Sequence, residues 1–130
     1  MDRLFLDANV LFSAAYRPEA GIARLWDFES VELITSPYAA EEARINLLET
    51  DQRQRLGKLL ERVQIVTGVS GLPPGVTLPE KDRPILQAAV QARATHLLTG
   101  DKRHFGKYFG RRYGGVLVLA PAEYFRRRRP

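Results

Sequence analysis

The 130-residue chain contains no cysteine, only two histidines, one tryptophan and one methionine. Without cysteine it can have no disulfide scaffold, no thiolate metal site and no cysteine nucleophile. Two histidines are too few for a histidine-rich zinc site. Any metal site in this chain is therefore expected to depend on oxygen ligands.

Long hydrophobic runs are also missing. A long uncharged stretch, residues 64–79, is interrupted throughout by glycine and proline, which does not fit a membrane-spanning helix. The apolar start of the chain is broken by Asp7 and Asn9, whereas the core of an export signal is continuously apolar. We therefore expect a cytoplasmic protein without a membrane segment.

Charge is distributed unevenly along the chain. Lys and Arg number 20 against 15 Asp and Glu, which gives a formal net charge of +5, and four of the basic residues form the run 126–129. We therefore divide the sequence into a single domain, residues 1–125, and a basic C-terminal tail, residues 126–130. Such a tail can bind nucleic acid, an acidic lipid surface or an acidic partner, and a solvated terminus can have the same composition.

Five short apolar runs predict the strands of a sheet. They occupy residues 3–6, 31–35, 63–67, 96–99 and 116–119. Near-continuous apolar runs are typical of strands that are buried on both faces of a parallel sheet. Helical patterns separate the runs, and the last predicted element is a strand. This alternation predicts an α/β fold, a three-layer α/β/α sandwich with a mostly parallel five-stranded sheet.

Acidic residues follow two of the predicted strands. Asp7 comes directly after the first strand, and Asp101 follows the fourth after a single glycine. The carboxyl ends of parallel strands meet at one edge of the sheet, where ligands bind in open α/β folds. We therefore expect both carboxylates at this edge, although each alone could equally be a helix N-cap or a turn residue.

Two further acids lie on the inner faces of predicted helices. At about 100° per residue, Asp82 falls in the middle of the apolar stripe that continues through Ile85. By the same geometry Glu42 borders the apolar face of its helix, while Glu41 points away from it. Asp82 could instead cap the helix that begins near Pro84, and Glu42 could be an ordinary surface charge.

Four carboxylates at one edge of a sheet would repel one another strongly. A divalent cation is the usual solution, and oxygen ligands suit Mg²⁺ or Mn²⁺ rather than zinc. Such an ion lowers the pKa of a bound water and holds a phosphodiester during in-line displacement. Basic residues stand beside the acids at Lys81, Arg83, Lys102 and Arg103. Each could be ordinary surface charge, but together with the acids they indicate phosphate chemistry.

Four segments together resemble the PIN-domain ribonuclease family. They are residues 5–11 (FLDANVL), 36–43 (SPYAAEEA), 81–86 (KDRPIL) and 98–105 (LTGDKRHF). The segments occur in the family's order and extend over nearly the whole domain. The resemblance implies an α/β/α sandwich and a Mg²⁺- or Mn²⁺-dependent endoribonuclease that cleaves single-stranded RNA with a metal-activated water.

The resemblance also implies roles for individual residues. It identifies four acids as metal-binding and catalytic residues, namely Asp7, Glu42, Asp82 and Asp101. Asn9 would orient Asp7 or contact the site, and Thr99 would support Asp101. Lys102 or Arg103 would meet the negative charge that develops on the phosphate.

Some positions depart from the family pattern. Ala8 stands where many members have Ser or Thr, and Lys102 and Arg103 occupy places where some members have a further acid. His104 could assist the site or be structural, and we expect His96 to be structural. Many small bacterial and archaeal members resemble VapC toxins, so the resemblance also implies an RNA substrate, a cognate antitoxin as partner and a homodimer.

Two other functions remain open on the sequence alone. A haloacid-dehalogenase-like phosphatase also has an Asp after its first strand and a late Gly-Asp pair. That family has a second Asp two residues after the first, where this chain has Asn9. A PIN-like module that binds RNA or protein without catalysis would have the same fold, and the presence of all four acids argues against it without proving activity.

Overall fold

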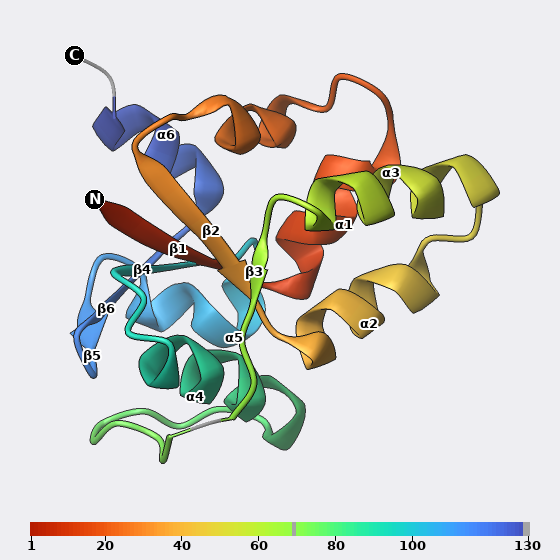
Figure 1. Ribbon diagram of the computed structural model, residues 1–130. Coiled ribbons are helices and arrows are strands. Elements are labelled where there is room, and N and C mark those ends of the chain that lie inside the picture. The colour runs from red at the N-terminus through yellow and green to blue at the C-terminus, as the bar shows by residue number, and fades with distance from the viewer. Residues whose placement is uncertain (69, 129–130) are drawn as a thin grey trace.

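The computed structural model describes residues 1–68 and 70–128, which form one sheet with helices on both faces (Figure 1). The strands are β1 (Asp2–Leu6), β2 (Val31–Thr35), β3 (Gln64–Ile65), β4 (His96–Leu98), β5 (Arg112–Tyr113) and β6 (Val116–Leu119). The α-helices are α1 (Ala8–Tyr16), α2 (Pro37–Asn46), α3 (Thr50–Leu60), α4 (Arg83–Gln91), α5 (Lys102–Phe105) and α6 (Pro121–Arg128). Three 3₁₀ helices are η1 (Gly21–Asp27), η2 (Glu80–Asp82) and η3 (Gly106–Tyr108).

The sheet has the strand order β3-β2-β1-β4-β6-β5, and every pair is parallel except β5 with β6. The mostly parallel three-layer sandwich is therefore confirmed, with six strands rather than the predicted five. The additional strand forms a hairpin in which only Gly114 and Gly115 lie between the two strands, both with positive φ. Paired glycines allow this tight turn, so the Gly-Gly dipeptide was the signal that the prediction missed.

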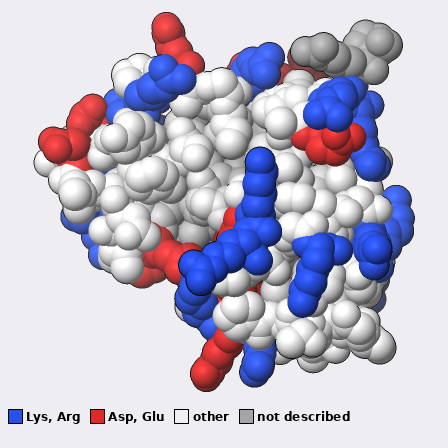
Figure 2. Space-filling model, turned by 180° about the vertical axis from the view of Figure 1, so that it is seen from behind, with Lys and Arg blue, Asp and Glu red and all other residues white. Residues whose placement is uncertain are grey.

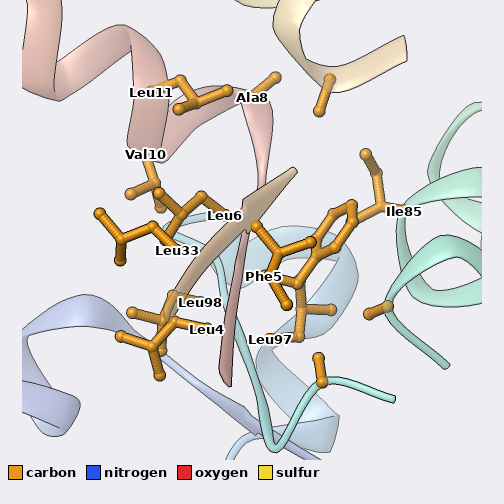
Figure 3. Close-up of a cluster of buried hydrophobic side chains, with 14 of the residues drawn as sticks. Leu4, Phe5, Leu6, Ala8, Val10, Leu11, Leu33, Ile85, Leu97 and Leu98 are labelled. Atoms are coloured by element: carbon orange, nitrogen blue, oxygen red, sulfur yellow. The ribbon is translucent and has the colours of Figure 1, made fainter. Parts of the chain in front are cut away.

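Two helical layers enclose the sheet. In Figure 1, α1, α3 and α6 lie above the sheet, and α4 and α5 lie below it. The side chains of β1 alternate between the two layers. Figure 3 shows Leu4 and Leu6 on the side of Val10 from α1, and Phe5 pointing toward Ile85 from α4. All five side chains are buried, so the central strand contributes to the core on both of its faces.

The last helix, α6, departs from the prediction, in which the strand of residues 116–119 is the last element. It packs through Tyr124, whose hydroxyl donates to Asp2 Oδ2 over 2.7 Å, and Arg128 donates to Ser30 Oγ over 3.0 Å. Figure 2 shows basic side chains gathered on the side of the molecule where the described chain ends. Residues 126–128 of the predicted basic tail are thus the last turn of a helix, and residues 129–130 lie outside the described part.

The strand order places a topological switch point between β1 and β4. From β1 the chain continues to β2 on one side, and it later returns through β4 on the other side. The connections leaving β1 and β4 therefore diverge at the carboxyl ends of these strands, the position where open α/β sheets bind ligands. Among the described residues, no helix is both long and apolar enough to cross a membrane.

Candidate metal centre

Asp7 follows the last residue of β1 and caps the N-terminus of α1. Its Oδ1 accepts a 2.7 Å hydrogen bond from the Ala8 backbone N–H. The residue is only 5% exposed. Burial raises the pKa of Asp7 from 3.8 to about 6, the hydrogen bonds from Thr99 and Ala8 oppose this rise, and the charges of Glu42 and Asp82 add to it. A carboxylate at this position is therefore costly when it is ionised and no cation is near.

Thr99 connects the ends of β1 and β4. Its hydroxyl donates to Asp7 Oδ2 over 2.8 Å and accepts from the Asp101 backbone N–H over 3.1 Å. Asn9 Nδ2 donates to Asp7 Oδ2 over 3.2 Å, and Asn9 Oδ1 accepts from the Gly100 N–H over 2.8 Å. Asn9 and Thr99 thus orient Asp7 and fix the turn that carries Asp101.

Asp82 and Asp101 converge on a single ring nitrogen. His104 Nδ1 lies 2.9 Å from Asp82 Oδ2 and 2.9 Å from Asp101 Oδ2. Asp101 also accepts a 3.1 Å hydrogen bond from the His104 backbone N–H, which makes it the N-cap of α5. Burial alone would raise the pKa of Asp101, but the backbone and ring hydrogen bonds of His104 outweigh it and lower this pKa.

One oxygen of this cluster lacks a hydrogen bond. The imidazole is hydrogen-bonded to Asp101, and its geometry toward Asp82 does not make a second hydrogen bond. Asp82 is 7% exposed, and its Oδ2 is buried without a hydrogen-bond partner among the described residues. The nearest cation on its other oxygen, Lys81 Nζ, lies 3.6 Å from Oδ1. A buried carboxylate oxygen in this state is available to bind a cation or a donor.

Glu42 interacts electrostatically with Asp7. It is half-buried on α2, and its charge raises the pKa of both Asp7 and the Tyr38 hydroxyl. For Tyr38 burial is the larger cause. Its neighbour Glu41 is exposed and bonds Arg44, 3.0 Å from Arg44 Nη2 to Glu41 Oε2. Glu42 is thus half-buried and Glu41 exposed, the difference that the helical phase predicts.

Tyr38 was missed by the sequence analysis. Its hydroxyl donates to the Lys81 carbonyl over 2.7 Å and so ties α2 to the turn that presents Asp82. Since Tyr38 precedes Glu42 by one helical turn, the helical phase could have placed it on the same face. Lys102 and Arg103, by contrast, are exposed at the start of α5 beside Asp101.

The residues present fit a divalent cation. Asp82, Asp101 and His104 each offer one ligand atom, and these atoms all lie within 4.8 Å of one another. A cation there would satisfy the orphaned Asp82 oxygen and reduce the repulsion between the carboxylates. Asp7 and Glu42 are outside this group of three and lie close enough for their charges to interact with one another.

Comparison with known proteins now identifies the family. The sequence model of the PIN domain matches residues 3–103. The chain belongs to the PIN domain family. This membership leaves the phosphatase alternative without support. Among curated proteins, none matches the chain by sequence.

Solved PIN-like structures share the fold. One is a chain of VapBC2 from Rickettsia felis, whose structure was solved with a DNA fragment from the VapBC2 promoter bound. It superposes with a TM-score of 0.65 at 12% sequence identity, and the match covers 91% of this chain and 98% of that chain. A chain of VapBC-1 from nontypeable Haemophilus influenzae gives a TM-score of 0.59 at 16% identity, covering 92% and 98%. At 12% and 16% sequence identity, these structural similarities show that the fold is shared.

Proposed function

We propose that this PIN domain is a metal-dependent endoribonuclease that cleaves single-stranded RNA in the cytoplasm. Its metal-binding and catalytic residues in this proposal are Asp7, Glu42, Asp82 and Asp101. The observation that carries the proposal is the buried Asp82 Oδ2, which has no hydrogen-bond partner among the described residues and faces the Asp101 carboxylate across His104. Carboxylates arranged in this way bind Mg²⁺ or Mn²⁺.

Each residue has a separate task in the proposed reaction. Asp82 and Asp101 would hold the ion, and when bound the ion supplies an activated water and neutralises charge on the phosphodiester. Asp7 faces the same edge of the sheet, where Thr99 and Asn9 fix its orientation. The exposed Lys102 and Arg103 stand beside Asp101 and are free to bind the phosphates on either side of the scissile bond. The expected products carry 5′-phosphate and 3′-hydroxyl ends.

Metal binding tests the proposal first, because it needs no knowledge of the RNA target. Metal-free protein is titrated with Mn²⁺ by calorimetry, and the same titration is made with Asp82→Asn. Asp51→Asn is the matched control, since Asp51 is an exposed acid on α3 that pairs with Arg55. We expect binding in the wild type and the control and none in Asp82→Asn. A wild type that binds no Mn²⁺ would overturn the proposal.

Cleavage is measured next on a pool of single-stranded RNA of random sequence. Loss of full-length RNA in the presence of Mn²⁺, absent with Asp82→Asn, is the expected result. Mn²⁺ binding without cleavage of any RNA in the pool would favour the alternative function, a PIN-like module that binds RNA or protein without catalysis.

We propose further that the domain is the toxin of a toxin–antitoxin pair and acts as a homodimer. The VapBC complexes among its structural neighbours support the antitoxin partner. The test is co-purification with the product of a small neighbouring gene, followed by light scattering of the chain alone. A monomer that captures no such product would contradict it.

A further inference from the structure

His104 lies between two carboxylates and is hydrogen-bonded to one of them. Its Nδ1 is 2.9 Å from one oxygen of Asp82 and from one oxygen of Asp101. A ring nitrogen carries at most one hydrogen in any protonation state, and among the described residues the hydrogen bond of this nitrogen goes to Asp101 Oδ2. The other acceptor, Asp82 Oδ2, is buried and has no hydrogen-bond partner among the described residues.

We propose that His104 Nδ1 is itself a metal ligand, together with Asp82 and Asp101, and that this nitrogen makes the centre prefer Mn²⁺ over Mg²⁺. The inference rests on the metal-dependent function proposed above. It adds an imidazole nitrogen to the carboxylate ligands that the sequence predicted.

The spacing of the three atoms supports coordination. Ligand atoms about 2.1 Å from one ion and at right angles to each other are about 3 Å apart. Both distances from Nδ1 to the carboxylate oxygens are close to this value. One ion bound by all three atoms would satisfy Asp82 Oδ2.

The fold holds the imidazole in place by two means. His104 lies in the first turn of α5, where its backbone N–H is bound by Asp101 Oδ1. The next residue, Phe105, is fully buried and anchors the turn in the core. The ring is therefore kept against the carboxylates, unlike Lys102 and Arg103, whose side chains are exposed.

Ligand chemistry gives the expected metal preference. Mg²⁺ favours oxygen ligands and keeps several waters, whereas imidazole suits the first-row transition ions. Replacing one oxygen ligand by imidazole should therefore strengthen Mn²⁺ binding relative to Mg²⁺.

Pulsed electron paramagnetic resonance of Mn²⁺-loaded protein detects the ligand directly. The chain contains only two histidines. The second, His96, lies at the start of β4, where its Nδ1 is 2.7 Å from Thr95 Oγ1 and its ring packs against Tyr124. We expect a nitrogen coupling from imidazole in the wild type and in the control His96→Gln, and loss of this coupling in His104→Asn.

Calorimetry then separates coordination from mere positioning. His104→Asn retains an amide that can donate to Asp101, but it lacks the ring nitrogen. We expect its Kd for Mn²⁺ to rise about tenfold, while the Kd for Mg²⁺ changes less than threefold. Equal changes for both ions, without a nitrogen coupling in the wild type, would overturn the proposal and leave His104 as a positioning residue.

Failure of this inference can be told apart from failure of the proposed function. Mn²⁺ binding that is lost in Asp82→Asn but is unchanged in His104→Asn leaves the nuclease proposal intact and removes only the histidine ligand. A wild type that binds no Mn²⁺ overturns both.

Discussion

The two edges of the sheet differ in how deeply their acids are buried. At the edge formed by the amino ends of the strands, Asp2 and Glu32 are only half-buried, and each has a partner. Asp2 accepts the Tyr124 hydroxyl, and Glu32 pairs with Arg3. At the carboxyl edge, Asp7 is raised in pKa by burial, and Asp82 keeps a buried oxygen without a hydrogen bond among the described residues.

The paired acids at the amino edge contribute to stability, whereas the buried acids at the carboxyl edge belong to the candidate metal centre. Both edges belong to the same strands, and the strands are buried along most of their length. Polar groups with partners cost little, whereas buried carboxylates without a cation disfavour the folded state. The carboxyl edge is therefore the region that binding can stabilise, and the amino edge is the region that holds the fold without it.

Truncation at the amino edge should have the largest effect on stability. Tyr124 is 2% exposed and contacts the rings of Phe28 and His96. Tyr124→Ala removes this packing and leaves Asp2 without its hydroxyl, so we expect the free energy of unfolding to fall by about 3–5 kcal/mol. Urea denaturation measures this loss. Mn²⁺ affinity at a temperature where the variant is folded should be unchanged, and a parallel loss of affinity would show that the two edges are coupled.

Removal of an acid at the carboxyl edge should instead increase the free energy of unfolding. The folded-state pKa of Asp7 is raised from 3.8 to about 6, so between these values the folded state binds more protons than the unfolded state. Stability is therefore lost as the pH rises through this window. Asp7→Asn does not titrate, and without metal it should be more stable than the wild type by up to about 3 kcal/mol above pH 6.

The pH profile makes this second prediction specific. Thermal or urea unfolding is compared for wild type and Asp7→Asn with a chelator present. The gain should shrink as the pH falls and disappear below about pH 4, where the wild-type carboxyl is protonated in both states. A gain that is independent of pH would point to packing rather than charge. In Mn²⁺ the order should reverse, since only the wild type retains this carboxylate at the centre.

The sequence predicted the parallel core of the fold well, because buried strands and the acids behind them are local signals. Asp7 follows an apolar run directly, and the helical phase distinguished Glu42 from Glu41. The prediction missed α6 and β5 for different reasons. The arginine-rich sequence of α6 has no local helical pattern of apolar residues, and the helix is stabilised by the tertiary contacts of Tyr124. Strand β5 is only two residues long and depends on the Gly114–Gly115 turn that pairs it with β6.

The role of His104 could not be read from the sequence. A histidine near an aromatic residue is commonly structural, and nothing local indicates that it lies against Asp82, 22 positions earlier in the chain. The contact arises because η2 and α5 meet below the carboxyl ends of the strands. Tyr38 is a similar case, since its bond to Lys81 joins two elements 43 positions apart.

The smallest expected effect distinguishes two neighbouring acids on one helix. Glu42→Gln removes a charge that raises the pKa of Asp7, so this pKa should fall in the metal-free protein, and Mn²⁺ affinity should weaken by several-fold because one anionic group is lost. Carboxyl NMR and calorimetry measure the two changes. Glu41→Gln is the matched control, since it breaks only the exposed pair with Arg44, and neither quantity should change. Equal effects of the two substitutions would mean that Glu42 acts only through the general charge of α2 and is not part of the centre.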